Sequence, residues 1–357
     1  MSAPTVNSTS VVAVSAASTP QSPTQRAWAR FKRNRLGYTA LWLFLVLLVV
    51  ATLGEVVSND KPFVAQINGK TYFPIVNNPS DLELGGDFRT PTDWKDPFVT
   101  GLLEQPGNWK IGTINPHPAT SFNYFSKRPN PAAPSADNWL GTDKFGRDML
   151  ARLLYGFRVS IWFAIALTLT GTLIGMAMGA VQGYFGGRLD LTTQRLIEIW
   201  GAVPELYLLI IAASIFEPSL LLLLVLLSLF GWIGLSDYVR AEFLRNRNLE
   251  FVKAARALGL SNLQIIRRHV LPNSLTPVIT FLPFRMSGAI FALTSLDFLG
   301  LGVPSSVPSL GELLNQGKDW LDAWWIIVPT FMVLTVTMTL LTFIGDALRD
   351  AFDTRKS

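Results

Sequence analysis

Six long apolar runs constrain what this chain can fold into more than any other feature of its sequence. Most reach the roughly 20 residues that a helix needs to cross about 30 Å of hydrocarbon, and the fourth does so when residues 219–238 are counted whole. Hydrophobic residues make up 49% of the 357 residues and charged residues only 15%, which indicates a polytopic membrane protein. We therefore predict an all-α protein with six transmembrane helices, at 38–57, 159–181, 196–216, 220–233, 277–303 and 324–344.

The distribution of basic residues predicts the orientation of these spans. Five basic residues precede the first run: Arg26, Arg30, Lys32, Arg33 and Arg35. Two follow the second run, Arg188 and Arg195. Seven follow the fourth run: Arg240, Arg245, Arg247, Lys253, Arg256, Arg267 and Arg268. The short third connection, at Glu217 and Pro218, has none. Because Lys and Arg beside a span are retained in the cytoplasm, both termini are expected there. The net charge of +5 follows from this topology and does not indicate a nucleic-acid partner.

Composition divides the chain into four parts. Residues 1–25 carry no charge and no periodicity, which predicts a disordered cytoplasmic tail. Residues 26–57 form a basic flank and the first transmembrane helix, which we interpret as an uncleaved signal anchor because no small-x-small cleavage site follows. Residues 58–140 are an outside segment, expected to form a small irregular subdomain or an aromatic rim at the lipid headgroups. Residues 141–357 hold the other five spans and a cytoplasmic loop at 240–273.

Two local patterns predict structure in and just after the outside segment. Asn68-Gly69 separates two short apolar stretches and predicts a β-hairpin with a type I′ turn. After residue 147 the apolar side chains fall on one helical face, while Asp148 and Arg152 stand four apart on the other face and can pair. This pattern predicts an interfacial helix that leads into the second span, or else an ordinary charged helix start.

Four glycines recur every four residues in the second span, at Gly171, Gly175, Gly179 and Gly183. They reduce one face of the helix to backbone and allow a second helix to approach closely. A helix face in contact with lipid gains nothing from the loss of side chains. The spacing therefore predicts that this helix packs inside the bundle.

Four ionisable residues lie in or near the third and fifth spans: Glu198, Glu205, Arg285 and Asp297. A charge at depth costs roughly 3 kcal/mol or more, so it is expected to face a partner or a water-filled substrate pathway. Arg285 and Asp297 are about 18 Å apart along a helix, too far to pair. We expect Arg285 to meet Glu205 across the bundle or a substrate carboxylate, whereas Glu198 and Asp297 are also compatible with snorkelling at a span end. Pro204 is expected to break the third helix.

Several kinds of chemistry lack the residues they need. The chain has no cysteine, so it holds no disulfide and no thiolate metal site, and we expect no metal site. It has no Gly-x-x-x-x-Gly-Lys-Ser/Thr loop, so we expect no ATPase activity, no catalytic residue and no bound cofactor. Its histidines, His117 and His269, both lie outside the spans, which disfavours an intramembrane serine peptidase. A single-chain, ion-coupled secondary transporter remains an alternative, although we detect no inverted repeat.

The loop between the fourth and fifth spans carries the most specific pattern. Residues 249–258 can form a short helix that Gly259 closes as a C-cap. Ser261 with Gln264 makes a capping box for a second helix, which Pro272 is expected to end. The small residues Ala254, Ala255 and Gly259 lie near one face, so the short helix can lie close against another protein. A helix-turn-helix DNA reader has a similar sequence, but spans on both sides leave this loop little freedom to enter a major groove.

At these residues the chain resembles the permease subunits of bacterial ATP-binding-cassette (ABC) importers. In that family the loop has a Glu-Ala-Ala, Gly and Ile-x-Leu-Pro pattern and forms the coupling helix, which sits in a groove of the ATPase subunit. The matching residues here are Ala254, Ala255, Gly259, Leu271 and Pro272, with Leu258 beside the glycine. Lys253 replaces the Glu and His269 the Ile. The resemblance implies the type I importer permease fold and an ATPase-coupling role for these residues.

Other motifs resemble the second permease of the peptide-importing subfamily. They are Gly-Thr-Asp-x-x-Gly-Arg-Asp at 141–148 and Phe-Leu-Gly-Leu-Gly at 298–302. The Yej type, associated with microcin C and oligopeptide uptake, is the most similar. Its supporting residues lie at 28–31, 59–62, 239–245, 296–300, 308–314 and 349–353. Asp297 stands where many relatives carry Ser and Leu310 where many carry Trp, which favours the Yej type over dipeptide or nickel importers.

The resemblance implies a set of partners and a location. The chain is expected in the bacterial inner membrane, surrounded by lipid, with residues 58–140 in the periplasm. A homologous second permease would complete the translocation pathway, a cytoplasmic ABC ATPase would bind ATP and Mg, and a periplasmic substrate-binding protein would deliver a peptide. No nucleic-acid partner is implied.

Overall fold

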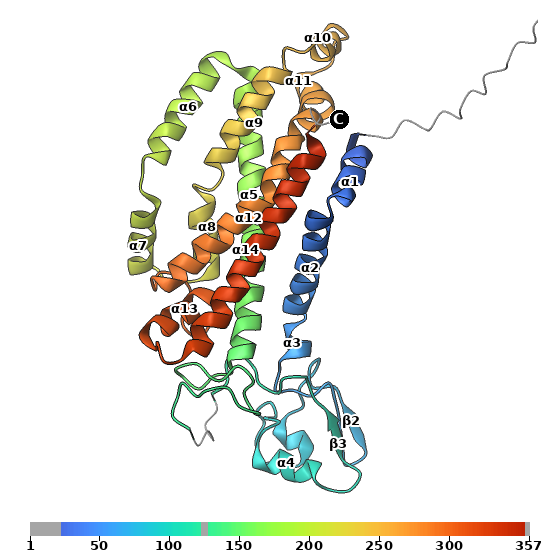
Figure 1. The fold of residues 1–357 in the computed structure, drawn as a ribbon, viewed down its shortest axis with the longest axis vertical. Coiled ribbons are helices and arrows are strands. Elements are labelled where there is room, and N and C mark those ends of the chain that lie inside the picture. The colour runs from blue at the N-terminus through green and yellow to red at the C-terminus, as the bar shows by residue number, and fades with distance from the viewer. Residues whose placement is uncertain (1–22, 123–127, 354–357) are drawn as a thin grey trace, which may run out of the picture.

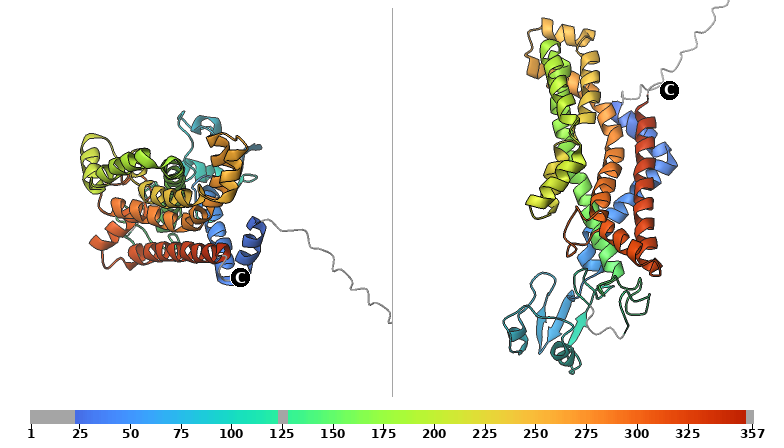
Figure 2. Two further views of the ribbon diagram at one scale, coloured as in Figure 1. Left: turned by 90° about the horizontal axis from the view of Figure 1, so that it is seen from above. Right: turned by 90° about the vertical axis from the view of Figure 1, so that its left-hand side faces the viewer.

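The computed structural model describes residues 23–122 and 128–353, so most of the predicted tail at 1–25 lies outside the described residues. An elongated bundle of helices carries a small β-sheet segment at one end and the α10–α11 loop, together with the C-terminus, at the other (Figure 1). The right-hand view of Figure 2 also shows the sheet and the loop at opposite ends. We call these the sheet end and the loop end.

The helices account for the predicted spans. Five stretches are long and apolar enough to cross a membrane, and a sixth is counted if one bent pair of helices is a single span, which confirms the expected architecture. The bundle consists of α1 (Pro23–Arg33), α2 (Arg35–Thr52), α3 (Gly54–Val57), α5 (Met149–Phe185), α6 (Gly187–Gly201), α7 (Glu205–Ile215), α8 (Leu220–Ser228), α9 (Ile233–Asn246), α10 (Glu250–Ala257), α11 (Asn262–Ile265), α12 (Leu271–Phe298), α13 (Leu310–Asp319) and α14 (Trp324–Phe352). The fourth span is α8 and α9 together.

The bent pair is the third span, and its break lies where the sequence predicts it. Helix α6 ends at Gly201 and α7 begins at Glu205, with a bend of 62° between them. Pro204 is the N-cap of α7. Proline lacks the N–H that a continuous helix requires, so the chain restarts there. As a result the carboxylate of Glu205 stands at a helix N-terminus in the middle of the span.

The sheet-end segment has a small core of its own. Strands β1 (Val64–Ile67), β2 (Lys70–Tyr72) and β3 (Trp109–Ile111) form an antiparallel sheet in the order β2-β1-β3. The hairpin turn has φ of 52° at Asn68 and 77° at Gly69, which confirms the type I′ prediction. Apolar side chains from the sheet, a 3₁₀ turn at Asp81–Leu84 and α4 (Pro97–Leu103) pack together around the buried Trp94.

Helix α5 begins differently from our expectation. The apolar face after residue 147 belongs to one continuous helix that runs to Phe185, not to a separate interfacial helix. Asp148 caps this helix by accepting a hydrogen bond from the Ala151 amide at 2.8 Å. Its side chain also accepts from the Asn115 and Asn138 amides, both at 2.8 Å. The predicted Asp148–Arg152 pair is therefore wrong, because the carboxylate is occupied at the helix end.

The predicted end of the second loop helix at Pro272 is also wrong. Residues 266–270 form a π-helical turn in which the Leu271 amide donates to the Ile266 carbonyl, and α12 continues directly from it. Proline is tolerated in the first turn of a helix, and the wider π turn precedes it. The loop is thus joined to the fifth span by continuous helix.

The glycines of α5 face α9. A Cβ atom placed on Gly175, Gly179 or Gly183 would lie 2.9, 2.5 and 2.5 Å from the carbonyl oxygens of Trp232, Ser236 and Arg240, respectively. At Gly171 the nearest backbone atom is the Gly231 oxygen, at 3.2 Å. Helix α5 thus approaches α9 and the turn just before it, backbone to backbone, at four positions. We call this contact the glycine seam.

The glycine seam predicts a stability effect. Replacing Gly179 with valine forces α5 and α9 apart, because its Cβ would overlap the Ser236 carbonyl, and overpacking of this kind costs about 1–3 kcal/mol. The expected result is a lower melting temperature for the detergent-purified protein. Gly234→Val is the matched control, since nothing lies within 4 Å of a Cβ at that position of α9. Equal melting temperatures for the two variants would contradict close packing at the seam.

Candidate functional site

The α10–α11 loop is anchored to the bundle by an apolar cluster. Val252 and Ile265 are fully buried, and they pack with Val239 and Phe243 of α9 and with Tyr184 at the end of α5. Ser261 and Gln264 form the predicted capping box at the start of α11. The loop is therefore an ordered part of the structure, directly attached to the two helices of the glycine seam.

Three polar contacts strengthen this attachment. The Tyr184 hydroxyl and the Asn262 side chain are 2.8 Å apart, and Arg247 donates to the Tyr184 carbonyl at 3.2 Å. The buried amide of Asn246 donates to the Ser274 hydroxyl of α12 at 2.9 Å. Arg247 and Asn262 thus attach the loop to α5, and Asn246, the last residue of α9, ties that helix to α12. A displacement of α10 therefore reaches all three helices through these contacts and through the apolar cluster.

The tip of the loop exposes apolar side chains. Leu258 is 81% exposed and Leu263 is 63% exposed, although both stand in a segment otherwise rich in charge. Gly259 between them has φ of +80°, as expected of a C-cap glycine. Exposed leucines beside an ordered turn are typical of a surface that another protein covers.

The residues assigned to this surface do not all lie on it. Ala254, Leu258, Gly259 and Pro272 are exposed, and Leu271 is half-buried. Ala255 is only 5% exposed and packs against its own chain in the cluster around Val252. Our expectation that Ala255 shares the docking face is therefore wrong, because helical spacing places it with Val252 on the inner face of α10.

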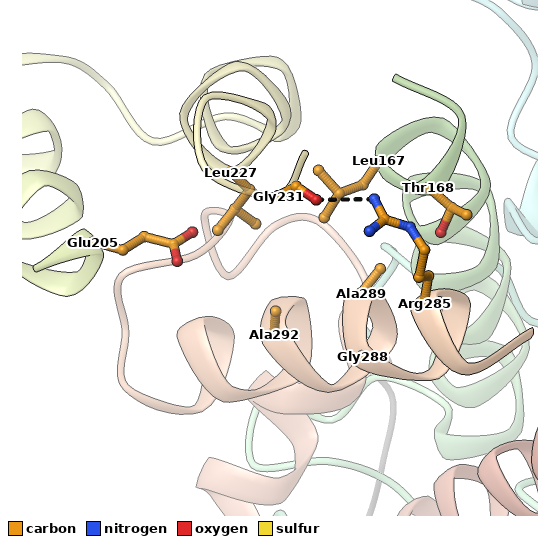
Figure 3. A pocket seen from close by; sticks show the side chains of 9 residues that line it. All are labelled: Leu167, Thr168, Glu205, Leu227, Gly231, Arg285, Gly288, Ala289 and Ala292. Atoms are coloured by element: carbon orange, nitrogen blue, oxygen red, sulfur yellow. Dashed lines mark hydrogen bonds between the residues drawn. The ribbon is translucent and has the colours of Figure 1, made fainter. Parts of the chain in front are cut away.

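The bundle also contains a mostly apolar cavity with two charged residues in its lining. It has a volume of about 240 Å³ and lies among α5, α8, α7 and α12, lined by Leu167, Thr168, Glu205, Leu227, Gly231, Arg285, Gly288, Ala289 and Ala292. Glu205 and Arg285 approach it from opposite sides, with Leu227 and Gly231 between them (Figure 3). The Arg285 guanidinium donates to the Gly231 carbonyl at 2.9 Å. The expected Glu205–Arg285 ion pair is not formed between these described residues, although both side chains line one cavity.

The cavity has hydrogen-bonding groups left to satisfy. Among the described residues, Arg285 Nε and Thr168 Oγ1 are buried atoms without a hydrogen-bond partner. Buried polar atoms are nearly always paired, so such groups indicate a bound molecule or water. Together with the carboxylate of Glu205, the cavity offers one acceptor site and one donor site on opposite walls.

The other two candidate pathway residues lie elsewhere. Glu198 is exposed on α6 and pairs with Arg195 at 2.6 Å. Asp297 is buried in the last turn of α12, where it accepts hydrogen bonds from the Val303 amide at 2.9 Å and from the Ser309 hydroxyl. It fixes the turn between α12 and α13. Neither residue lines the Glu205–Arg285 cavity.

A buried ion cluster at the sheet end was not predicted. Glu312 of α13 accepts from Arg152 at 2.5 Å and from Arg147 at 3.3 Å, and Arg147 binds Asp143 at 2.6 Å. Gln316 bridges Glu312 and Asp143. The cluster therefore joins the motif at 141–148 to the motif at 308–314. Both motifs are visible in the sequence, but no local spacing signals a contact between residues about 160 positions apart.

A helical bundle of apolar spans, with charged residues at a cavity between them and an exposed loop at one end, suits a transport permease. Residues 171–357 match the family described as binding-protein-dependent transport system inner membrane component, and residues 22–78 match the N-terminal TM domain of oligopeptide transport permease C. The chain belongs to the first of these families, the inner membrane permeases of ABC importers.

Known permeases resemble the chain over nearly its whole length. It is 47% identical to the inner membrane ABC transporter permease protein YejE of Escherichia coli (strain K12), over 93% of this chain and 97% of that protein. It is 43% identical to the peptidoglycan transport system permease protein YejE of Agrobacterium fabrum, over 94% of this chain and 93% of that protein. The dipeptide transport system permease protein DppC of Bacillus subtilis is 30% identical, over 92% of this chain and 85% of that protein.

A chain of the inward-facing MetNI methionine ABC transporter superposes with a TM-score of 0.49 and 18% identity, covering 57% of this chain and 98% of that chain.

The ion cluster predicts a stability effect that depends on burial. Glu312→Gln leaves Arg147 and Arg152 without their shared carboxylate, and breaking a buried pair costs about 3–5 kcal/mol. We expect a clear drop in the melting temperature of the purified protein. Asp319→Asn is the matched control, because its partner Lys318 lies on the same helix, 3.6 Å away, and both side chains are more than half exposed. An equal, small effect in both variants would show that the cluster does not hold α13.

Proposed function

We propose that this chain is one of two homologous permease subunits of an ABC importer for oligopeptides or peptide-like compounds. Family membership supports the importer assignment. The names of the similar proteins, which include dipeptide, oligopeptide and peptidoglycan transport systems, support a peptide-like cargo. A microcin C type of cargo belongs to the same chemical class. The observation that carries the proposal is the ordered loop with the exposed Leu258 and Leu263, at the position of the family's coupling helix.

In this proposal the loop end is cytoplasmic and the sheet end periplasmic. Basic side chains support this orientation, because α1, the π turn at Ile266–Val270 and the end of α9 all carry arginines at the loop end. A cytoplasmic ATPase then docks on Leu258 and its neighbours. A periplasmic substrate-binding protein delivers cargo at the sheet end, where residues 58–140 project from the bundle.

Coupling follows from the way the loop is anchored. Closure of the ATPases on ATP displaces α10, and the contacts of Val252 with the cluster and of Asn246 with Ser274 pass that displacement to α5, α9 and α12. Helices α5 and α12 also form walls of the cavity. Nucleotide binding outside the membrane is thereby linked to the access equilibrium of the pathway. This chain holds the pathway, and its partner hydrolyses ATP.

The cavity supplies the contacts that a peptide requires. A free peptide carries an ammonium group and a carboxylate, and Glu205 and Arg285 present the complementary charges on opposite walls. We propose that these two residues touch cargo during its passage. The alternative of a single-chain ion-coupled transporter has no support from the family or from the similar proteins.

The docking role of the loop predicts a transport defect without a folding defect. Leu258→Asp places a charge on the exposed apolar tip, so ATPase co-purification and ATP-dependent peptide uptake should fall at least about tenfold, the effect of roughly 1.4 kcal/mol or more. The amount of inserted protein should not change. Val76→Asp makes the same chemical change at an 87% exposed site of the sheet end and should behave as the native chain. Normal uptake by the Leu258 variant would refute the coupling assignment.

The cavity predicts a different defect. Arg285→Gln removes the charge that would meet a peptide carboxylate, and loss of a charged hydrogen bond costs about 1.5–3 kcal/mol. Uptake of a free peptide should fall about tenfold or more, while the ATPase still co-purifies. A peptide amidated at its C-terminus should be taken up equally by the native and variant chains. If the variant loses both peptides to the same extent, Arg285 is structural and does not contact the cargo carboxylate.

A further inference from the structure

A second cavity lies at the loop end, between α1, α12 and α14. Its volume is about 600 Å³, within the range typical of small-molecule sites. Its lining comprises Arg26, Ala27, Arg30, Pro272, Asn273, Leu275, Thr276, Ile279, Ala351 and Phe352. Pro272 is the one residue of the lining that also belongs to the coupling set, and no lining residue belongs to the loop tip or to the Glu205–Arg285 site.

The polar part of this cavity is cationic. Arg26 and Arg30 contribute to the lining, and no acidic side chain of the described residues does so. Arg30 is half-buried and donates from Nη1 to the Asp353 carbonyl at the end of α14, at 3.2 Å. That contact fixes the guanidinium in place and uses one of its five N–H groups. The guanidinium is therefore held at the cavity with donors to spare, in a geometry that suits a phosphate.

The remaining lining is mostly apolar. Leu275 and Ile279 follow one another on a face of α12, one turn apart, and lead away from Asn273 at the start of that helix. Ala27 and Phe352 close the other sides. The cavity thus has a cationic end and an aliphatic wall, which matches a molecule with an anionic head and a hydrocarbon tail.

Helix α1 has the features of a helix that lies at a membrane surface. Its last turn is basic, with Arg30, Lys32 and Arg33, and its hydrophobic residues lie on one side. Trp28 is 47% exposed and stacks on Phe31, with the Lys32 ammonium 5.4 Å from its ring. Exposed Trp beside basic side chains is typical of the headgroup level. The cationic end of the cavity therefore lies at the depth of lipid phosphates.

We propose that this cavity binds an anionic phospholipid of the surrounding membrane, with its phosphate at Arg26 and Arg30 and an acyl chain along Leu275 and Ile279. Basic pockets between membrane helices recognise anionic headgroups in this way. The lipid bridges α1 and α14 to the start of α12, the helix that continues from the α10–α11 loop. The proposal depends on the membrane location of the chain and is independent of the cargo and of the ATPase partner.

The test is a lipid titration, followed by native mass spectrometry, of the full-length protein solubilised from membranes. The probes are phosphatidylglycerol and phosphatidylcholine with identical acyl chains, so that headgroup charge is the variable. The native protein should retain phosphatidylglycerol roughly thirtyfold better, since the two arginines contribute about 1 kcal/mol each and about 1.4 kcal/mol corresponds to tenfold. Arg26→Gln/Arg30→Gln should abolish this preference. Lys32→Gln/Arg33→Gln removes the same charge from the same helix outside the cavity lining and should keep most of it.

Thr276→Trp provides a second variant with all charges intact, because the larger side chain fills the cavity wall. It should lower retention of both lipids and keep the native fold even if the double arginine variant does not. Equal retention of the two lipids by the native protein would overturn the proposal. So would equal losses in the two double variants, which would indicate general surface electrostatics. Unchanged retention in all variants would also overturn it, because the lipid would then bind elsewhere on the protein.

Discussion

The glycine seam between α5 and α9 is the contact on which the rest of the structure depends. In a bilayer there is little hydrophobic drive for helices to associate, so close packing of backbones must supply the attraction. The seam lets α9 lie against α5 at the spacing of backbone atoms, from Gly231 to Arg240. Helix α5 in turn reaches from the ion cluster at the sheet end to Tyr184 beneath the loop. One rigid helix pair therefore connects the two ends of the molecule.

Buried charged residues hold the segments of the sheet end together. Arg147 and Arg152 are almost completely inaccessible, and they contact Glu312, Asp143 and the carbonyl of Ser305. Asp148 caps α5 and binds the outside segment through Asn115. These contacts fix α13 and the sheet-end segment to the first turn of α5. The charges at the Glu205–Arg285 cavity are arranged differently, because they face an open space and do not pair with each other.

Local signals in the sequence predicted local structure well. The apolar runs, the break at Pro204, the Asn68-Gly69 turn and the Ser261–Gln264 capping box depend on neighbouring residues, and each is present. Long-range pairing was not predictable. Asp148 and Arg152 have the right spacing to pair, yet asparagines and Glu312 from distant segments compete for them. The inner position of Ala255 likewise depends on where α9 and α5 lie, which the loop sequence alone does not specify.

We propose that the tip of the α10–α11 loop docks on an ATPase. Because the chain has no cysteine, a single cysteine at position 258 reports on that contact alone. It should cross-link to the co-expressed ATPase with a short bifunctional reagent, and a single cysteine at the exposed position 76 of the sheet end should not. A cysteine at 258 that reacts with a maleimide but never cross-links to the ATPase would contradict the account.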